Sequence, residues 1–345
     1  MTKYYLQIFL FITGTAFSSP VHANTPFHDS SIFIDNQQLA RTINIGYVLN
    51  SEMNNHTIDS LLKQLETLKE MHFTAARIPI DWISAMDSGK EFIIHDSFLQ
   101  NIDQVVQKVL SLQMALILDN HSDEDLMNDP VRWRSRLLAL WTQLAQHYKK
   151  ISHQLIFEPL AEPHGNMNPY WNSLIPDLLA RIRTYDPERP VIIGPIFFNQ
   201  PDFLNQLMLP ANDRCIIVSF HQYKPVRFTM QGEIWFPYGK PLEWIGTPWP
   251  QKDEEKSLDL LFSRVGIWAK ANHRPVFLGE FGVSSFADIP SASRWIQFNR
   301  SEAEKNGFSW AFWSCYGFEF SLFDAKTQRW NIKFLKALMP EYYSD

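Results

Sequence analysis

Two glutamates that follow strand-like apolar runs are the residues of this sequence best suited to chemistry. Glu162 lies at the end of the run Leu155–Pro163, and Glu280 at the end of the run Pro275–Gly282. A carboxylate buried at the end of a strand is costly unless it is paired or used. Two carboxylates facing one pocket can cleave a glycosidic bond, one as proton donor and one as nucleophile or base. For each glutamate alone, a strand-end salt bridge is the alternative.

Further polar, ionisable or aromatic residues stand at the ends of other apolar runs. Read together, the residues at these ends are Arg77, His121, Glu162, His221, Tyr223, Glu280 and Trp313. In a parallel barrel the carboxyl ends of all strands meet at one face, and barrel enzymes carry their active sites there. A lone histidine such as His121 is more often structural than a ligand. The joint pattern, however, predicts a functional site.

Strand-like and helix-like segments alternate along the chain and must position these residues. The predicted strands are Thr42–Tyr47, Thr74–Ile80, Met114–Asn120, Gln154–Glu162, Val191–Pro195, Cys215–Tyr223, Val276–Gly282 and Phe308–Ser314. The predicted helical segments are Thr57–Met71, Phe98–Leu112, Val131–Lys150, Trp171–Tyr185, Phe203–Leu207, Glu255–Asn272, Ser291–Asn306 and Ile332–Met339. Eightfold alternation predicts a single (β/α)8 (TIM) barrel. A doubly wound sheet is the alternative, but it favours a glycine-rich turn after the first strand, which Gly46–Asn50 does not provide.

One connection, Lys224 to Glu254 after the sixth strand, is unusually long for a compact domain. Its aromatic residues are Phe228, Trp235, Phe236, Tyr238, Trp244 and Trp249. So many aromatic residues argue against disorder. We therefore predict a cleft wall or lid, in which Trp235 and Trp244 bind substrate.

The N-terminus has the pattern of a secretory signal peptide. Lys3 precedes an apolar stretch from Tyr4 to Phe17, which is too short to span a bilayer, and Val21-His22-Ala23 fits a cleavage site. We expect residues 1–23 to be removed and residues 24–345 to form one catalytic domain. The protein is then secreted or periplasmic, without a membrane association after cleavage, and we expect a monomer.

Charge, cysteine placement and acidic residues limit which binding partners, disulfides and metal sites we expect. The formal net charge is −6 and no long basic patch occurs, so nucleic acid is excluded as a partner. Cys215 begins one predicted strand and Cys315 follows the end of another. They would lie roughly 20 Å apart at opposite ends of the sheet, so we expect two free thiols. The segment Asp119–Asp125 is acidic but lacks the spacing of a calcium loop, and we expect neither metal nor cofactor.

In its strand-end motifs the chain resembles glycoside hydrolase family 5, the cellulase-type retaining β-glycosidases, over essentially all of residues 24–345. The matching motifs are Arg77-Ile78-Pro79-Ile80-Asp81-Trp82, Leu118-Asp119-Asn120-His121, Glu162-Pro163-His164, His221-Gln222-Tyr223, Gly279-Glu280-Phe281-Gly282 and Phe312-Trp313-Ser314. Each motif is weak alone, but six in the family's order are specific. The resemblance implies an exported retaining β-glycoside hydrolase, similar to endo-β-glucanases, that cleaves β-linked glucan or mannan by double displacement.

The resemblance also implies roles for the individual residues. Glu162 would be the acid/base and Glu280 the nucleophile. Arg77 and the Tyr223 hydroxyl would hold the charge of the nucleophile, and His221 would tune the protonation of the acid/base. Two further residues would face the sugar being cleaved, with His121 contacting its hydroxyls and Trp313 forming its hydrophobic floor.

Three residue-level points qualify this expectation. Ala161 stands where the family has an asparagine that contacts the substrate 2-hydroxyl, so a catalytically weakened glycan-binding relative is the alternative. Glu158, four residues before Glu162, would lie roughly 13 Å deeper in the barrel as a structural carboxylate with an Arg or His partner. A barrel esterase would need a Gly-x-Ser-x-Gly elbow, which the sequence lacks.

Overall fold

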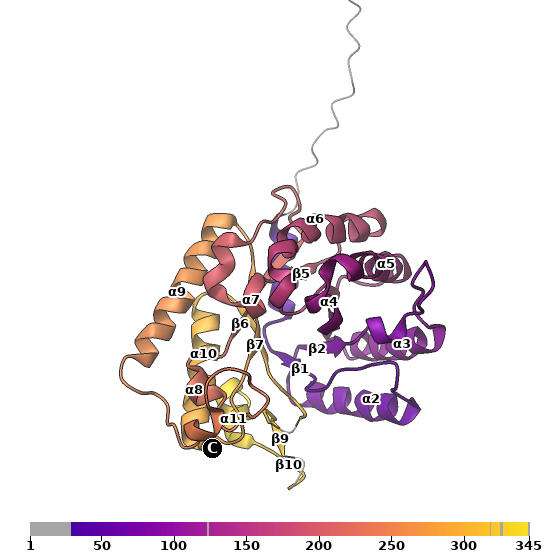
Figure 1. Cartoon of the computed structure of the whole chain (residues 1–345). Coiled ribbons are helices and arrows are strands. Elements are labelled where there is room, and N and C mark those ends of the chain that lie inside the picture. The colour runs from indigo at the N-terminus through magenta and orange to yellow at the C-terminus, as the bar shows by residue number, and fades with distance from the viewer. Residues whose placement is uncertain (1–28, 123, 318, 325–326, 344–345) are drawn as a thin grey trace, which may run out of the picture.

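Eight parallel strands close into a barrel in chain order, β1 to β8, and helices surround it (Figure 1). The computed structural model describes residues 29–122, 124–317, 319–324 and 327–343. The closed barrel confirms the predicted fold and excludes an open sheet. The predicted signal peptide at residues 1–23 lies outside the described residues. No helix within the described ranges is long and apolar enough to cross a membrane.

The elements have the following bounds. The barrel strands are β1 (Thr42–Asn44), β2 (Ala75–Ile80), β3 (Ala115–Asn120), β4 (Leu155–Glu158), β5 (Val191–Ile193), β6 (Ile216–Gln222), β7 (Val276–Phe281) and β8 (Ser309–Phe312). The helices are α1 (Asp29–Gln38), α2 (Asn55–Glu70), α3 (Asp96–Ser111), α4 (Glu124–Asn128), α5 (Pro130–Tyr148), α6 (Asn168–Tyr185), α7 (Ile196–Asn199), α8 (Val226–Thr229), α9 (Glu254–Asn272), α10 (Ile289–Lys305) and α11 (Ile332–Leu338). Short 3-10 turns are η1 (Ile83–Ala85), η2 (Gly165–Met167), η3 (Pro201–Gln206) and η4 (Pro241–Trp244), and β9 (Phe323–Asp324) pairs with β10 (Arg329–Trp330).

Local sequence explains where the outer helices begin. The side chain of Asn54 accepts a hydrogen bond from the backbone of Thr57 at the start of α2, and Asp288 does the same for Ser291 in α10. Such caps satisfy backbone N–H groups that have no partner within the helix. The buried residues of α2, Ile58, Leu61, Leu65 and Leu68, follow the helical repeat and form one apolar face toward the barrel.

The strand predictions are correct in number and order. Those for β2 and β3 end at the observed residues, and the other six are too long at the carboxyl end. The largest error is in β4, which ends at Glu158 rather than Glu162. In β4, apolar residues continue beyond the last residue that pairs with a neighbouring strand. The apolar pattern therefore does not show where the strand ends. Glu162 itself has a left-handed backbone, with φ of 47°, which is incompatible with a continuing strand.

Helix α1 was not predicted, and it closes the amino-terminal end of the barrel. Its sequence shows no clear stripe of apolar residues at helical spacing. Ile32 of α1 and Leu39 just after the helix are the apolar residues that pack against the lowest layer of the barrel. Asn36 ties the helix to the barrel through a bond to the Val276 carbonyl at 3.2 Å and one from the Ser309 hydroxyl at 2.7 Å. A plug of this kind depends on the shape of the barrel end rather than on local periodicity.

The barrel interior is built in layers because alternate strand residues face inward. The lowest layer is apolar and consists of Ala75, Ala115, Ile117, Ile156, Ile192, Ile217, Phe277 and Ala311. Two residues further along three of these strands, the inward positions are Arg77, Asp119 and Glu158, all fully or almost fully buried. The polar residues of the site therefore rest on an apolar floor inside the same barrel.

Candidate active site

Arg77 joins the buried acidic groups at the centre of the barrel. Its guanidinium contacts Glu158 at 2.6 and 3.1 Å, Asp119 at 3.0 Å and Glu280 at 2.9 Å. It also donates to the Asn44 side chain at 2.9 Å. Every donor group of the fork is thereby engaged with an oxygen acceptor, which fixes the position of the guanidinium.

The charges of this cluster do not balance, because three carboxylates surround one guanidinium. Burial raises the pKa of Glu158 to about 7, since Asp119 and Glu280 add to the effect and only Arg77 opposes it. Glu158 was expected to have an arginine or histidine partner, and that partner is Arg77. That arginine also holds Glu280, however, so Glu158 lies directly beneath the site rather than in a remote layer.

An irregularity in β7 turns Glu280 into the barrel. Phe220 pairs with Leu278, but His221 pairs with Glu280, so Gly279 is an extra residue in the ladder. Such bulges re-aim side chains next to active sites. A Cβ at Gly279 would lie 2.9 Å from the His221 ring, so no larger residue fits there.

Glu280 is held from two sides. Arg77 contacts one carboxylate oxygen, and the Tyr223 hydroxyl donates to the other at 2.9 Å. Burial, reinforced by the charge of Glu280, raises the pKa of Tyr223 well above its ordinary value. Tyr223 therefore keeps its proton and donates it in a hydrogen bond, which favours the ionised form of the carboxylate.

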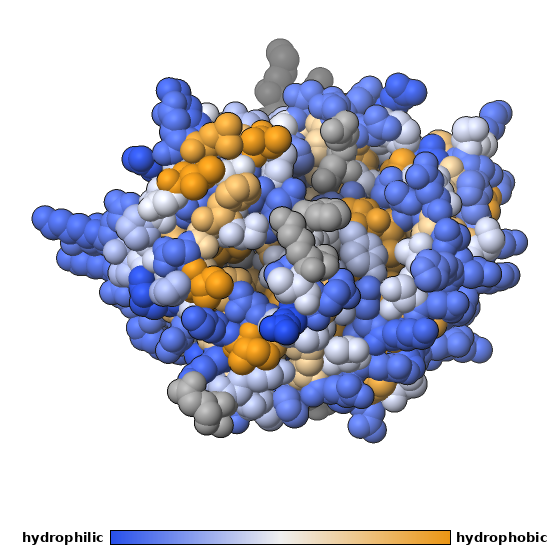
Figure 2. Space-filling model, turned by 90° about the horizontal axis from the view of Figure 1, so that it is seen from below, coloured by the Kyte–Doolittle hydropathy of each residue, from blue (hydrophilic) through white to orange (hydrophobic). Residues whose placement is uncertain are grey.

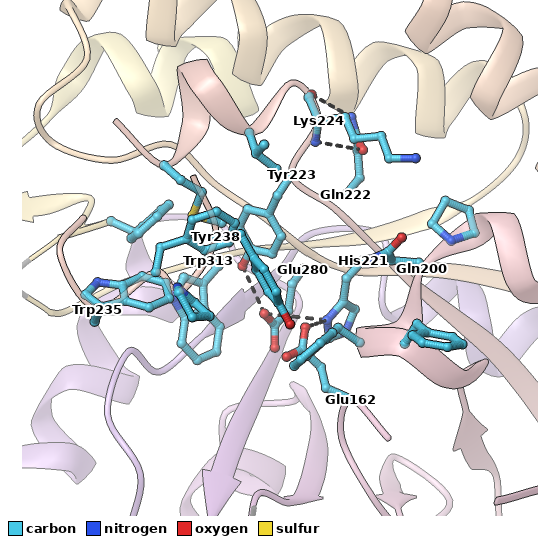
Figure 3. Close-up of a pocket in the computed structure, with 18 of the residues that line it drawn as sticks. Glu162, Gln200, His221, Gln222, Tyr223, Lys224, Trp235, Tyr238, Glu280 and Trp313 are labelled. Carbon is cyan, nitrogen blue, oxygen red and sulfur yellow. Dashed lines mark hydrogen bonds and ion pairs between the residues drawn. The ribbon is translucent and has the colours of Figure 1, made fainter. Parts of the chain in front are cut away.

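Glu162 faces Glu280 across the pocket (Figure 3). Its left-handed backbone after β4 and its bond to His221 Nδ1, at 2.6 Å, place it there. Oxygen atoms of Glu162 and Glu280 and a ring nitrogen of His221 all lie within 4.8 Å of one another. The Glu162 side chain is 25% exposed and the Glu280 side chain 6%, so Glu162 is the more accessible of the pair.

His221 is neutral because burial lowers its pKa to about 4. Its second ring nitrogen, Nε2, lies 3.2 Å from the side-chain amide nitrogen of Asn199. An amide nitrogen donates, so Nε2 accepts, and the imidazole proton lies on Nδ1 toward Glu162. The Asn199 amide thus fixes the tautomer that donates a hydrogen bond to Glu162.

Asn199 was not predicted as a site residue. It is fully buried at the end of α7 with φ of 55°, and a Cβ at Gly194 would clash with its side chain. The run Phe197, Phe198 and Asn199 is left-handed throughout. The one local signal was an asparagine, which tolerates this backbone, just after a strand.

His121 and Trp313 lie on the opposite side of the pocket from α7. His121 Nδ1 is 3.0 Å from Asp119, and its ring is nearly parallel to the Trp313 ring, with centroids 6.3 Å apart. Both line the pocket together with Glu162 and Glu280. The structure therefore brings these predicted residues together at one site.

The pocket has a volume of about 430 Å³, and the long loop after β6 forms one wall of it. Trp235 and Tyr238 of this loop line the pocket, as Figure 3 shows. Trp244 is not among the lining residues and instead packs behind Phe236, with ring centroids 6.3 Å apart. Its predicted contact with substrate is therefore not supported by its position, which suits a residue that braces the loop.

Several lining residues were not named individually as site residues, and most of them come from loops whose shape the sequence does not reveal. They are Phe197, Phe198, Gln200, Pro201, Gln222, Lys224, Val226, Met230, Phe236, Pro237, Tyr238 and Phe320. Ala161, in contrast, is buried and not among the lining residues, and its backbone N–H donates to the Asn120 carbonyl.

In the described part of the chain, Glu162, His221 and Glu280 form a cluster of three residues that could each offer a ligand atom to a metal ion. Both oxygens of Glu280 already accept hydrogen bonds, from Arg77 and Tyr223. The positive charge of Arg77, 2.9 Å away, also opposes a cation. The donor set therefore suits proton transfer and nucleophilic attack better than metal binding.

Comparison with known proteins agrees with this geometry. Residues 44–319 match the family model described as cellulase (glycosyl hydrolase family 5). Endoglucanase H of Acetivibrio thermocellus is 27% identical over 329 residues, which cover 91% of this chain and 35% of the relative. Cellodextrinase A of Ruminococcus flavefaciens is 25% identical, covering 79% of this chain and 84% of the relative. The chain thus spans about a third of the length of endoglucanase H.

Solved structures of similar fold include endoglucanase Cel5A of Thermotoga maritima. It is 35% identical, with a TM-score of 0.84 and coverage of 89% of this chain and 99% of that one. Structures of that protein were determined in complex with cellobiose and with mannotriose.

Proposed function

The chain belongs to glycosyl hydrolase family 5, and from this premise we propose that it is an exported, retaining β-glycoside hydrolase of β-linked glucan or mannan. The observation that carries the proposal is the spacing of the two glutamates, whose oxygens lie within 4.8 Å. Retaining glycosidases have carboxyl groups about 5–5.5 Å apart, whereas inverting ones leave room for a water molecule between them. The short spacing supports direct attack by one carboxylate.

In the first step, Glu280 attacks the anomeric carbon and the glycosidic C–O bond breaks. Arg77 and Tyr223 hold the attacking carboxylate in its charged form and fix its direction. Glu162 gives its proton to the departing oxygen, so the leaving group departs as a neutral alcohol. The product of this step is a glycosyl ester of Glu280.

In the second step, water attacks the anomeric carbon and gives a proton to Glu162. Neutral His221, held by Asn199, donates a hydrogen bond to Glu162 and so stabilises the carboxylate form that must accept this proton. Glu280 is released, and the product keeps the β configuration because two inversions have occurred.

The stereochemical outcome is the direct test. Proton NMR of a cellobioside digest should show the β-anomer first, with the α-anomer forming only by mutarotation. Glu280→Gln should lose turnover while keeping its melting temperature, because no glycosyl ester can form. Glu162→Ala with added azide should give a β-glycosyl azide. Initial release of the α-anomer would disprove the nucleophile assignment.

The choice of glycan rests on the relatives, since endoglucanase and cellodextrinase names point to β-glucan and the Cel5A complexes include a mannotriose. Reducing-end assays on β-glucan, carboxymethylcellulose and mannan would decide among them. Export rests on the N-terminal sequence pattern. Cell fractionation and N-terminal sequencing of the mature protein, which should begin at Asn24, would test it.

A further inference from the structure

One half of the active-site pocket is formed by the loops after β5 and β6. Its walls are Phe197, Phe198 and Pro201 on one side and Val226, Trp235 and Tyr238 on the other. In Figure 3 Trp235 and Tyr238 lie on the opposite side of the two glutamates from Gln200, and the Tyr238 side chain extends toward the glutamates. This half is thus continuous with the catalytic pair.

This half offers few hydrogen-bond partners to a ligand. Both ends of the Gln222 amide are bonded to the Lys224 backbone, and the Lys224 ammonium contacts Asp202 at 2.5 Å. The Trp235 ring N–H donates to Glu233 at 2.8 Å. Among the described residues that line this half, Gln200 and Tyr238 are the other side chains with polar groups. A sugar ring carries several hydroxyls, and each one buried without a partner is costly.

The apolar side chains of this half are also open to solvent in the free protein. Phe197 is 40% exposed, Val226 37%, Trp235 53% and Tyr238 60%. Figure 2 looks onto the face at which Figure 1 places α8, β9 and β10, and hydrophobic groups interrupt its mainly hydrophilic surface. Apolar surface that borders a binding site is typical of a contact with an apolar ligand group.

The loops that form this half lie next to Glu162, the proton donor, so this half is the side on which the leaving group of the substrate binds. Glu162 follows β4 and is bonded to His221 of β6, next to the loops after β5 and β6. His121 and Trp313 follow β3 and β8, which lie across the barrel from β5 and β6. Trp235 extends from the loop after β6 toward that side, where its ring centroid lies 6.3 Å from that of Phe320. A leaving group takes its proton from Glu162, so it departs toward the apolar half.

We propose that the leaving-group half binds an apolar aglycone, so that this protein also cleaves amphiphilic β-glycosides such as alkyl β-cellobiosides. The inference rests on the proposed glycosidase function. Glu280 attacks the anomeric carbon, the bond to the alkoxy oxygen breaks, and the proton of Glu162 completes the alcohol. Water then releases cellobiose from Glu280 and returns a proton to Glu162.

The test is a series of methyl, butyl and hexyl β-cellobiosides, each below its critical micelle concentration. Their leaving alcohols have similar basicity, so differences in kcat/KM report contacts of the alkyl chain rather than chemistry. Each buried methylene is worth roughly fourfold, so kcat/KM should rise at least about tenfold from methyl to butyl. Cellotriose and cellotetraose, which offer a sugar in the same place, serve as the comparison.

Two other outcomes are distinguishable. Equal kcat/KM along the alkyl series, with a gain from cellotriose to cellotetraose, would overturn the inference and leave the glycosidase function standing. Absence of turnover for every one of these compounds, and for mannotriose and mannotetraose as well, would overturn both, because the proposed function includes mannan.

Variants locate the effect in this half of the pocket. Val226→Asn and Tyr238→Ser should each reduce the hexyl-to-methyl ratio of kcat/KM several-fold, with melting temperatures confirming that both fold. Tyr238 is well exposed, so its replacement is the safer of the two for folding. Ile267→Asn on α9, a site 69% exposed and outside the pocket, is the matched control and should keep the full ratio. An unchanged ratio in both pocket variants would contradict the proposal.

Discussion

At the scale of single residues, Ala161 is where this chain departs from the pattern of its family. Its side chain is buried and does not line the pocket, so it offers nothing to a substrate. The neighbouring Glu162, with Arg77, Tyr223 and His221, retains the contacts that the proposed mechanism needs. The departure therefore affects one substrate contact rather than the catalytic pair.

Ala161→Asn should restore a hydrogen bond that forms mainly in the transition state. The expected gain is on the order of 10–100-fold in kcat and in kcat/KM together. Ala161→Leu, of similar bulk without an amide, is the control and should show no gain. A fall in activity with Asn would mean that the space serves an unusual substrate. No change at fixed melting temperature would favour a glycan-binding protein with weak catalysis.

Glu158 gives a prediction for the pH dependence of stability. Its pKa in the folded protein is raised to about 7, above its ordinary value, so the folded state holds a proton that the unfolded state has released. The stability contributed by this proton is present at low pH and is lost as the pH rises toward and through 7. Chemical denaturation of wild type and Glu158→Gln from pH 5 to 8 should show a fall that only the wild type undergoes.

The control for this effect is Glu66→Gln, since Glu66 is an exposed carboxylate on α2 and should keep the wild-type profile. Glu158→Ala should be destabilised by on the order of 3 kcal/mol, because it removes a buried partner of Arg77. Parallel pH profiles for wild type and Glu158→Gln would show that Glu158 is ionised throughout.

At the scale of elements, the long loop between β6 and α9 contains aromatic residues with different tasks. Phe228 and Trp249 are buried and anchor its two ends on the barrel. Trp235 lines the pocket and is held by Glu233, whose carboxylate also contacts Ser284 of the next loop. Trp244 packs behind Phe236.

Replacing these two tryptophans should therefore separate binding from stability. Trp235→Ala should raise KM roughly two- to tenfold with little change in kcat, because stacking away from the scissile bond contributes to binding in both states. Trp244→Ala should leave KM nearly unchanged and cost about 1–2 kcal/mol of stability, since its side chain is half-buried. Steady-state kinetics and thermal melts measure both, and a larger KM effect for Trp244 would contradict the assignment.

At the scale of the whole molecule, no disulfide holds the barrel together within the described residues. Cys315 is buried, Cys215 is half-buried, and both are free. The melting temperature should therefore change by less than about 1 °C when a thiol reductant is added, whereas loss of a native disulfide would cost roughly 2–5 kcal/mol. A clear decrease in reductant would reveal a crosslink between chains.

The sequence alone determined the number and order of the barrel strands and most of the residues at their carboxyl ends. Strand and helix periodicity are local, and a parallel barrel gathers strand ends at one face whatever its details. Hence Arg77, Glu162, His221, Tyr223 and Glu280 could be assigned to one site before any contact was known.

Only the tertiary structure decided how those residues are aimed. The extra residue Gly279 turns Glu280 inward through the register of β7 against β6, and register depends on residues far apart in the chain. Asn199 reaches His221 only because Gly194 leaves room for it. Helix α1 and the walls of the apolar half likewise take their positions from packing between distant segments, which leaves no periodic signal in the sequence.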